Sequence, residues 1–221
     1  MYEYDAINRL DTIDDLLGTN DVAYEFDPNG NTLSKTEAGL TTTLLYDIRD
    51  QLSEVRQDIS TLGRYGYDYD RRRILKLGDD GIRRYSYDQL SVITEADVAN
   101  ATVSKYDHGL DQLVSLDNTV EARSFFHLDI LRSTVSLSDA AGSTRQSIFY
   151  DAWGNERERV GASTNKFTYT GHEKDEETGL IYAKARFYDP DIGRFLNQDP
   201  LFGDAASPPL RLRFLESLPV R

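Results

Sequence analysis

The sequence predicts an all-β fold made of consecutive antiparallel hairpins, and three observations support that prediction. An aromatic residue followed by aspartate recurs about every 21 residues along most of the chain. Turn-forming residues come twice in each interval, which leaves strands of about five to seven residues. Tyrosine is abundant, with 14 copies against 9 phenylalanines and 1 tryptophan. Its ring suits half-buried strands that keep one polar tip.

The aromatic–Asp pair is expected at the end of a strand. Its ring can pack on the neighbouring hairpin while a tyrosine hydroxyl stays hydrated or hydrogen-bonded. The Asp carboxylate can then accept backbone N–H bonds from the turn that follows. We therefore expect the rings of Tyr46, Tyr69, Tyr87 and Tyr106 to lie on one common surface. The pairs are Tyr4-Asp5, Phe26-Asp27, Tyr46-Asp47, Tyr69-Asp70, Tyr87-Asp88, Tyr106-Asp107 and Tyr150-Asp151, with Leu128-Asp129 as a degenerate copy.

Each repeat unit has a polar turn after the pair, as in residues 27–31 and 151–155, and a second turn that often contains glycine. Helical spacing is an alternative for residues 8–17 and 48–59. Turn signals about every ten residues argue against helices of useful length. We expect helix in less than about one tenth of the chain.

The composition narrows the classes of function. Lys and Arg total 25 against 38 Asp and Glu, a formal net charge of −13, which repels phosphate backbones and disfavours nucleic-acid binding. The chain has no cysteine, so disulfides, thiol nucleophiles and cysteine-bound zinc are excluded. His108, His127 and His172 lie far apart without ligand spacing, and we expect neither a metal nor a cofactor.

Targeting signals are not visible in the sequence. No apolar run approaches the roughly 20 residues that a membrane helix needs. The opening residues 1–5 do not resemble a secretory signal. We expect a protein that is cytoplasmic before export and then secreted or displayed on the cell surface by another route, or else a piece of a longer reading frame.

The most specific stretch lies near the C-terminus, and it predicts short aromatic strands separated by turns. Residues 181–188 alternate in the manner of one strand, with Ile181 and Phe187 on one face. Asp189-Pro190 is expected to end that strand, Gly193 to permit a reversal and Asp199-Pro200 to end the next strand. The motifs are Phe167-Thr168-Tyr169-Thr170-Gly171, Thr178-Gly179-Leu180, Ala185-Arg186-Phe187-Tyr188-Asp189-Pro190, Gly193-Arg194-Phe195 and Asp199-Pro200.

These motifs, in this order and at these spacings, resemble the RHS repeat-associated core domain over about Tyr150 to Pro200. The aromatic–Asp pairs upstream are similar to the YD repeats of RHS, teneurin and toxin-complex C-subunit proteins. The resemblance implies hairpins that coil into a spiralling β-shell, of which this chain would be part. We accordingly expect YD hairpins over residues 1–148, a core domain over 149–204 and an atypical tail over 205–221.

The resemblance implies three functions. The first is structural: a segment of a shell that encloses a toxin, with the remaining shell, a C-terminal toxin domain and its immunity protein as partners. The second is enzymatic: an aspartyl autoprotease, with Asp189 and Asp199 as the paired carboxylates and Arg186 as their charge partner. The third is adhesion or contact with carbohydrate through exposed tyrosines. The downstream region that such an autoprotease would cut is missing from this sequence.

Structural explanations stand beside the enzymatic one. An Asp before Pro can simply end a strand, and Arg186 can pair with such a carboxylate to hold the turn. We expect residues 175–177 to form a solvated acidic hairpin tip and residues 71–73 a solvated basic turn. Trp153 is expected to pack as an anchor, and His172 to be a polar strand residue.

Overall fold

The computed structural model describes residues 1–7, 9–14, 21–110 and 112–199. In this part of the chain the fold is almost entirely β, as predicted, with twenty strands and a single 3₁₀ turn at Tyr169–Gly171. Strands β1 to β16 follow one another in chain order in one antiparallel sheet, which we call the wall. The wall strands are β1 (Tyr2–Tyr4), β2 (Leu10–Ile13), β3 (Val22–Phe26), β4 (Thr32–Glu37), β5 (Leu40–Tyr46), β6 (Leu52–Gln57), β7 (Ser60–Tyr67), β8 (Arg73–Gly78), β9 (Gly81–Asp88), β10 (Ser91–Ala96), β11 (Thr102–Gly109), β12 (Gln112–Asn118), β13 (Ser124–Leu128), β14 (Thr134–Ser138), β15 (Thr144–Tyr150) and β16 (Glu156–Gly161).

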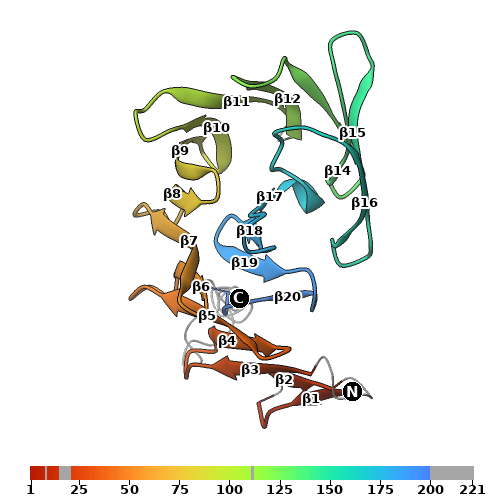
Figure 1. The fold of residues 1–221 in the computed structure, drawn as a ribbon. Helices are drawn as coiled ribbons and strands as arrows, with labels where there is room; N and C mark the ends of the chain where they lie inside the picture. Colours follow the sequence, from red (N-terminus) through yellow and green to blue (C-terminus); the bar gives the residue numbers. More distant parts are fainter. Residues whose placement is uncertain (8, 15–20, 111, 200–221) are drawn as a thin grey trace, which may run out of the picture.

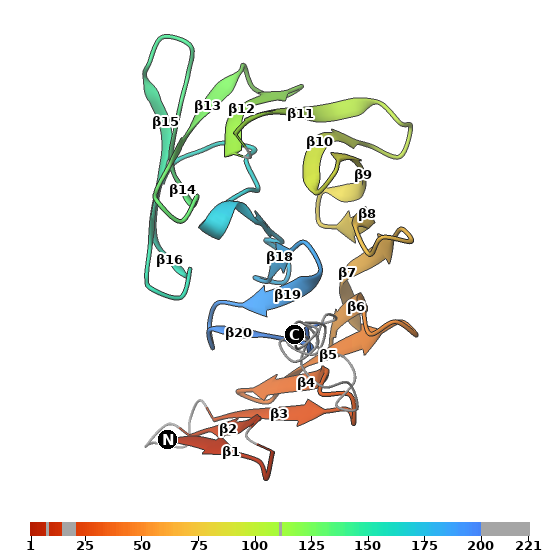
Figure 2. The same ribbon diagram turned by 180° about the vertical axis from the view of Figure 1, so that it is seen from behind.

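The wall curves into an open arc, and the last part of the described chain lies inside it (Figures 1 and 2). This inner segment, residues 162–199, carries a second antiparallel sheet of four strands in chain order. Each wall strand therefore has one face toward the inner segment and one toward solvent. The inner strands are β17 (Glu173–Lys174), β18 (Ile181–Ala183), β19 (Arg186–Asp189) and β20 (Arg194–Phe195).

The aspartates of the repeat close loops of a common form, which we call Asp loops. In the first complete example the N–H of Asp27 donates to the carbonyl of Asn31 at 3.0 Å, and the N–H of Asn31 donates to Asp27 Oδ1 at 2.8 Å. Gly30 adopts a left-handed φ of 84°, which glycine reaches without steric cost. The same pair of bonds closes the loops that begin at Asp5, Asp47, Asp68, Asp97, Asp129, Asp139 and Asp151.

Three of the predicted repeat positions were wrong. Asp68 closes the loop in which Asp70 was expected, and Tyr69 is 93% exposed. Asp88 and Asp107 lie within strands β9 and β11. Residues 67–70 contain two consecutive aromatic–Asp pairs, so the sequence allows either Asp68 or Asp70 to begin the loop. The Tyr67 ring packs inward, and the loop therefore begins at Asp68. The loops at Asp97 and Asp139 were missed because no aromatic residue precedes them.

The tyrosines at strand ends have the predicted double role. Tyr67 donates its hydroxyl hydrogen to the Leu52 carbonyl at 2.6 Å, and Tyr87 donates to the Arg73 carbonyl at 2.7 Å. Both rings pack against buried clusters on the inward face of the wall. Tyr46 and Tyr106 also contribute to this face, so the expectation of one common surface holds for three of the four named rings.

Three apolar clusters join the wall to the inner segment. In one of them Phe187 packs at 4.8 Å, centroid to centroid, on the Tyr65 ring of the wall. In the second, the inner ring Phe167 meets Tyr106 edge-on at 4.8 Å. The first cluster contains Leu44, Leu52, Val55, Tyr65, Leu180, Tyr182, Phe187 and Leu196; the second Tyr85, Val92, Tyr106, Leu113, Leu116 and Phe167; the third Leu10, Val22 and Tyr24 with Ile192 against them.

Along one rim of the wall, successive loops are tied by polar side chains. The Arg9 guanidinium donates to the carbonyl of Asp27 at 3.0 Å, one loop further along. Arg49 likewise donates to the Asp68 carbonyl at 3.1 Å. These bonds replace, at the rim, the water that would otherwise satisfy the loop carbonyls.

The prediction of one strand over residues 181–188 was wrong. The chain turns at Lys184-Ala185, so β18 and β19 form a hairpin in which Ala183 faces Arg186. Lys184 takes a left-handed φ of 63°, and the alternation that suggested a continuous strand spans both arms of the hairpin. The strand end at Asp189 and the reversal at Gly193, with a φ of 64°, are confirmed. The strand expected to end at Asp199 is wrong, because β20 already ends at Phe195.

Several expectations stay predictions. The domain boundaries after residues 148 and 204 are untested, and the wall sheet continues to Gly161. The tail over 205–221 lies outside the described residues. The stretch 48–59, which allowed helical spacing, contains strand β6. Among the described residues, no helix has the length and apolar character that crossing a bilayer requires.

Candidate functional site

The predicted site residues lie in the inner segment, on and after strand β19. Arg186 Nη2 and Asp199 Oδ2 form an ion pair at 3.1 Å, and the Arg186 guanidinium also lies over the Phe195 ring at 3.6 Å. The structure therefore brings two of the three predicted residues together. The pairing is also what the structural explanation of Arg186 expects.

Asp189 has different neighbours. Its side chain is buried, and Oδ1 accepts the N–H of Asp191 at 2.9 Å. Lys35 of the wall interacts with it electrostatically and pairs with Asp191 at 3.5 Å. Burial raises the pKa of Asp189, and the Lys35 ammonium only partly offsets this effect. The roles predicted for Asp189, Asp199 and Arg186 in catalysis stay predictions.

A buried cluster of charges connects the wall to the hairpin tip of the inner segment. Arg73 of β8 contacts Asp175 Oδ2 at 2.6 Å and Glu173 Oε2 at 2.7 Å. Lys76 of the same strand contacts Asp175 Oδ1 at 2.7 Å and Glu177 Oε1 at 3.0 Å. The side chains of Arg73 and Asp175 have no exposed area at all. We call these five residues the ionic cluster.

Aromatic rings complete the surroundings of the ionic cluster. The Arg73 guanidinium carbon lies 4.4 Å from the Tyr182 ring centroid and 5.3 Å from that of Tyr85. Tyr85 also donates its hydroxyl hydrogen to Glu173 Oε1 at 2.7 Å. Cation–π contacts of this kind are stronger when the cation is desolvated. Residues of the wall and of the inner segment thus surround Arg73 with carboxylates and aromatic rings.

Within the cluster, Asp175 and Lys76 hold each other in their charged forms. Burial acts to raise the pKa of Asp175, but the Arg73 guanidinium and the Lys76 ammonium outweigh it and hold the pKa below its usual range. Burial alone would lower the pKa of Lys76, and Asp175 together with Glu173 reverses that effect, so the net pKa is raised. Such a cluster requires all its members, because removing one leaves an uncompensated buried charge.

Both surface predictions for this region were wrong in part: Glu176 is exposed in the turn as expected, but Asp175 and Arg73 are not exposed. Asp175 was expected at a solvated hairpin tip and Arg73 in a solvated turn, yet each is fully buried against the other. The two residues are 102 positions apart, so no local pattern could pair them. In β8, Arg73 and Lys76 are buried while Ile74 between them is 39% exposed, an inversion of the usual apolar-in pattern that only the structure reveals.

Smaller contacts fix the two ends of the inner segment. A Cβ on Gly193 would come within 2.6 Å of the Trp153 ring, which confirms the packing role predicted for this exposed tryptophan. Asn155 Nδ2 donates to the Pro190 carbonyl at 2.9 Å. His172, predicted on a strand, lies just before β17, with Nδ1 2.8 Å from Thr170 Oγ1.

This arrangement is suited to holding the inner segment in place. Within the described ranges, no group of His, Asp and Glu side chains is placed to hold a metal ion. The members of the ionic cluster are paired with one another across the joint between the wall and the inner segment. These ion pairs attach residues 162–199 to the concave face of the wall.

Comparison with known proteins agrees with this architecture. The family model described as Teneurin YD-shell matches residues 7–213. The tRNA3(Ser)-specific nuclease WapA of Bacillus spizizenii is 33% identical over 193 residues, and the double-stranded DNA deaminase toxin A of Burkholderia cenocepacia is 31% identical over 224 residues. Each match covers 84% of this chain. The chain spans 8% of the length of the first relative and 16% of the second.

Solved structures share the fold at lower identity. A crystal structure of TcdB2-TccC3-Cdc42 aligns with a TM-score of 0.57 and 17% identity, over 90% of this chain and 14% of that one. The Tc holotoxin pore of Photorhabdus luminescens aligns over the same shares, with a TM-score of 0.56 and 17% identity. The curved wall of hairpins, the Asp loops and the match over residues 7–213 lead to one conclusion: this chain belongs to the teneurin YD-shell family.

Proposed function

We propose that this chain is a segment of an RHS-type shell wall whose concave side encloses a polypeptide toxin that leaves the cell with it. The ionic cluster is the observation that carries the proposal. It fixes the inner segment on the concave face of the wall, so the chain that follows starts from inside the arc (Figure 1). The relatives named as a tRNA nuclease and a DNA deaminase toxin support a toxin as the enclosed polypeptide.

The arc alone does not close, so the remaining shell is an expected partner. The wall ends in β1 on one side and β16 on the other, and each has one neighbour in the described sheet. Strand edges of this kind present backbone donors and acceptors to further strands. Other turns of the same spiral would continue the sheet from there.

Photo-crosslinking tests on which side of the wall a following polypeptide lies. A reporter polypeptide would be fused after Arg221, and a benzophenone amino acid placed at Leu40 or at Leu33. Leu40 is 50% exposed on the face of β5 that carries buried Leu44, whereas Leu33 is 37% exposed on the opposite face of the neighbouring strand. Crosslinks to the reporter from position 40 but not from 33 are expected. Equal crosslinking from both positions would contradict enclosure.

Autoproteolysis is the second candidate function. An aspartic dyad needs one protonated and one ionised carboxyl group. Burial raises the pKa of Asp189, which favours its protonated form, and Asp199 forms an ion pair with the Arg186 guanidinium at 3.1 Å. The two carboxyl groups thus lie in different surroundings, and this difference is the observation that favours the second candidate.

Cleavage can be tested by appending a downstream segment from a relative and following the chain by mass spectrometry. The parent should release the segment, and Asp199→Asn and Asp189→Asn should not. Equal cutting in parent and variants, or none in the parent, would reject the proposal. An immunity protein and carbohydrate stay predicted partners; a glycan array without hits would remove the second.

A further inference from the structure

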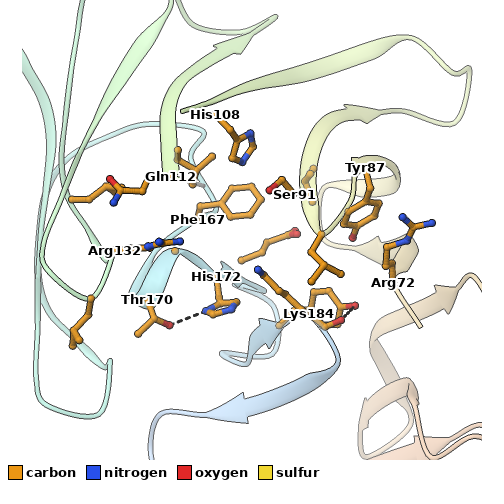
Figure 3. Close-up of a pocket in the computed structure, with 18 residues that line it drawn as sticks. Arg72, Tyr87, Ser91, His108, Gln112, Arg132, Phe167, Thr170, His172 and Lys184 are labelled. Atoms are coloured by element: carbon orange, nitrogen blue, oxygen red, sulfur yellow. Dashed lines mark hydrogen bonds between the residues drawn. The ribbon is translucent and has the colours of Figure 1, made fainter. Parts of the chain in front are cut away.

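A cavity of about 360 Å³ lies between the wall and the inner segment, away from Asp189 and the predicted dyad. Its walls come from strands β9 to β12, from the Asp loop before β14 and from residues 167–173 and 182–184 of the inner segment. Figure 3 shows the Phe167 ring in the middle of the lining side chains, with His108 and Gln112 on one side and His172 and Lys184 on the other.

The polar side chains that line the cavity are mostly cationic. Arg72, Arg132 and Lys184 contribute three positive groups. Glu173 is the one acidic residue among the described lining, and its two oxygens already contact Arg73 and the Tyr85 hydroxyl. Arg72 is itself paired with the carboxylate of Asp68, and Lys184 lies exposed at the turn of the β18–β19 hairpin. A local excess of positive charge is unusual in a chain of net charge −13.

The two imidazoles in the lining are polar but uncharged at neutral pH. Burial, with a further contribution from the Lys184 ammonium, lowers the pKa of His172 to about 4. Burial also lowers the pKa of His108. Each neutral ring can donate or accept one hydrogen bond per nitrogen, according to its tautomer. The cavity therefore offers hydrogen-bonding groups near its cations without adding more charge.

The lining also has a large apolar part. Phe167 and Tyr87 contribute aromatic rings, and Val92 and Leu113 contribute aliphatic surface. Small-molecule sites have this character, a mostly apolar enclosure of about 300–1,000 Å³ with a few placed polar groups. A strongly hydrated ion such as free phosphate would leave that apolar surface unused.

We propose that this cavity binds an amphipathic carboxylate, with its charged end at Lys184 and its aromatic or aliphatic body against Phe167. The carboxylate could belong to an acidic side chain of a polypeptide or to a free small acid, and both share this chemistry. The proposal is independent of toxin enclosure, since Lys184 and Phe167 are not members of the ionic cluster.

The dye 8-anilinonaphthalene-1-sulfonate, an aromatic anion, serves as the first probe, with binding followed by fluorescence. Lys184→Glu should weaken binding about tenfold or more, the effect of roughly 1.4 kcal/mol from reversing one contact charge. Lys105→Glu makes the same charge change at an exposed position on β11 and should leave binding unaltered. Circular dichroism would verify that both variants fold. Equal dye binding in the parent and Lys184→Glu would overturn the proposal.

Competition against the dye then identifies the ligand class. N-acetylphenylalanine and its neutral amide share one body and differ only in the carboxylate, so only the acid should displace the dye. An acetylated, amidated peptide with aspartate between two phenylalanines tests the polypeptide source. Displacement by either carboxylate supports the site and names its source. Displacement by neither, or equal displacement by the neutral amide, would overturn the proposal.

Discussion

His172 lies where the wall meets the inner segment, and its titration should affect stability. Its pKa in the folded chain is lowered to about 4 by burial and by Lys184, against roughly 6.5 when unfolded. The unfolded chain therefore takes up this proton first as the pH falls. We expect the free energy of unfolding to drop by up to about 3 kcal/mol between pH 6.5 and 4 from this residue.

His172→Asn would remove that dependence, because asparagine does not titrate. Urea unfolding at several pH values from 7 to 4 would measure the difference between variant and parent. The parent should lose stability relative to the variant as the pH falls through this range. Curves that stay parallel would contradict the lowered pKa.

Asp189 should change the pH dependence of stability in the opposite direction to His172. Burial raises its pKa in the folded chain, so ionising this carboxyl group destabilises the fold, and this cost disappears as the pH falls through the folded pKa. Asp189→Asn keeps an oxygen that can accept the Asp191 N–H and should raise the Tm at pH 7. Asp191→Asn, at an exposed position, should change stability by no more than about 0.5 kcal/mol. A lower Tm for Asp189→Asn would contradict the prediction.

At the scale of single elements, the Asp loop is the repeated unit of construction. One carboxylate satisfies N–H groups at both the second and the fourth following residue, as Asp47 does for Arg49 at 2.8 Å and Gln51 at 3.0 Å. The loop thereby closes without help from the rest of the fold. Its repetition keeps successive hairpins in the same register along the wall.

The tandem pairs at residues 67–70 offer a matched test of this loop. Asp68→Ala should cost about 1–3 kcal/mol, because it leaves the N–H of Arg72 without its carboxylate acceptor. Asp70 belongs to the second aromatic–Asp pair of the tandem, and its side chain is mostly exposed. Asp70→Ala should therefore change stability by less than about 0.5 kcal/mol. Denaturant unfolding would measure both variants. Equal effects would show that the loop does not depend on its first aspartate.

The tyrosines of the same tandem allow a parallel test. Tyr67→Phe removes the bond to the Leu52 carbonyl and should cost about 1 kcal/mol, whereas Tyr69→Phe should be neutral. Thermal unfolding would distinguish them. If Tyr67→Phe left the Tm unchanged, the hydroxyl group of Tyr67 would contribute nothing to stability, and only its ring would matter.

Local pattern predicted the elements well and the partners of charged residues poorly. Hairpins, loop aspartates and inward tyrosines follow from alternation and turn chemistry within a few residues. The choice of Asp68 over Asp70 as the loop residue, and the turn at Lys184, could not be predicted from local pattern. Both depend on which aromatic rings the wall buries. Arg73 and Asp175 could not be paired, because their contact depends on the curvature of the whole sheet.

For the molecule as a whole, the ionic cluster decides whether the inner segment stays on the wall. Arg73→Met would leave Asp175 and Glu173 short of a buried partner and should cost about 3–5 kcal/mol. Arg71→Met, in the same basic run, is the control and should cost far less. Denaturant unfolding gives the energies, and limited proteolysis within residues 162–199 reports release of the inner segment.

A double variant tests whether the cost arises from the unpaired charge. Arg73→Met combined with Asp175→Leu should cost clearly less than the sum of the two single changes, because no member of that pair is then left alone. Additive costs would assign the loss to packing instead. An Arg73→Met chain within about 1 kcal/mol of the parent would contradict the role of the cluster.

The chain order of these partners has a consequence for biosynthesis. Arg73 leaves the ribosome 102 residues before Asp175, which at about 5–20 residues per second is roughly 5–20 s. During that interval the Arg73 guanidinium of the nascent wall is hydrated and the aromatic rings around it are exposed to solvent. In the finished protein the same groups are buried. Translation therefore delivers the hairpins first and the carboxylates that lock them last, so a ribosome that stalls before Asp175 would leave an unsealed intermediate.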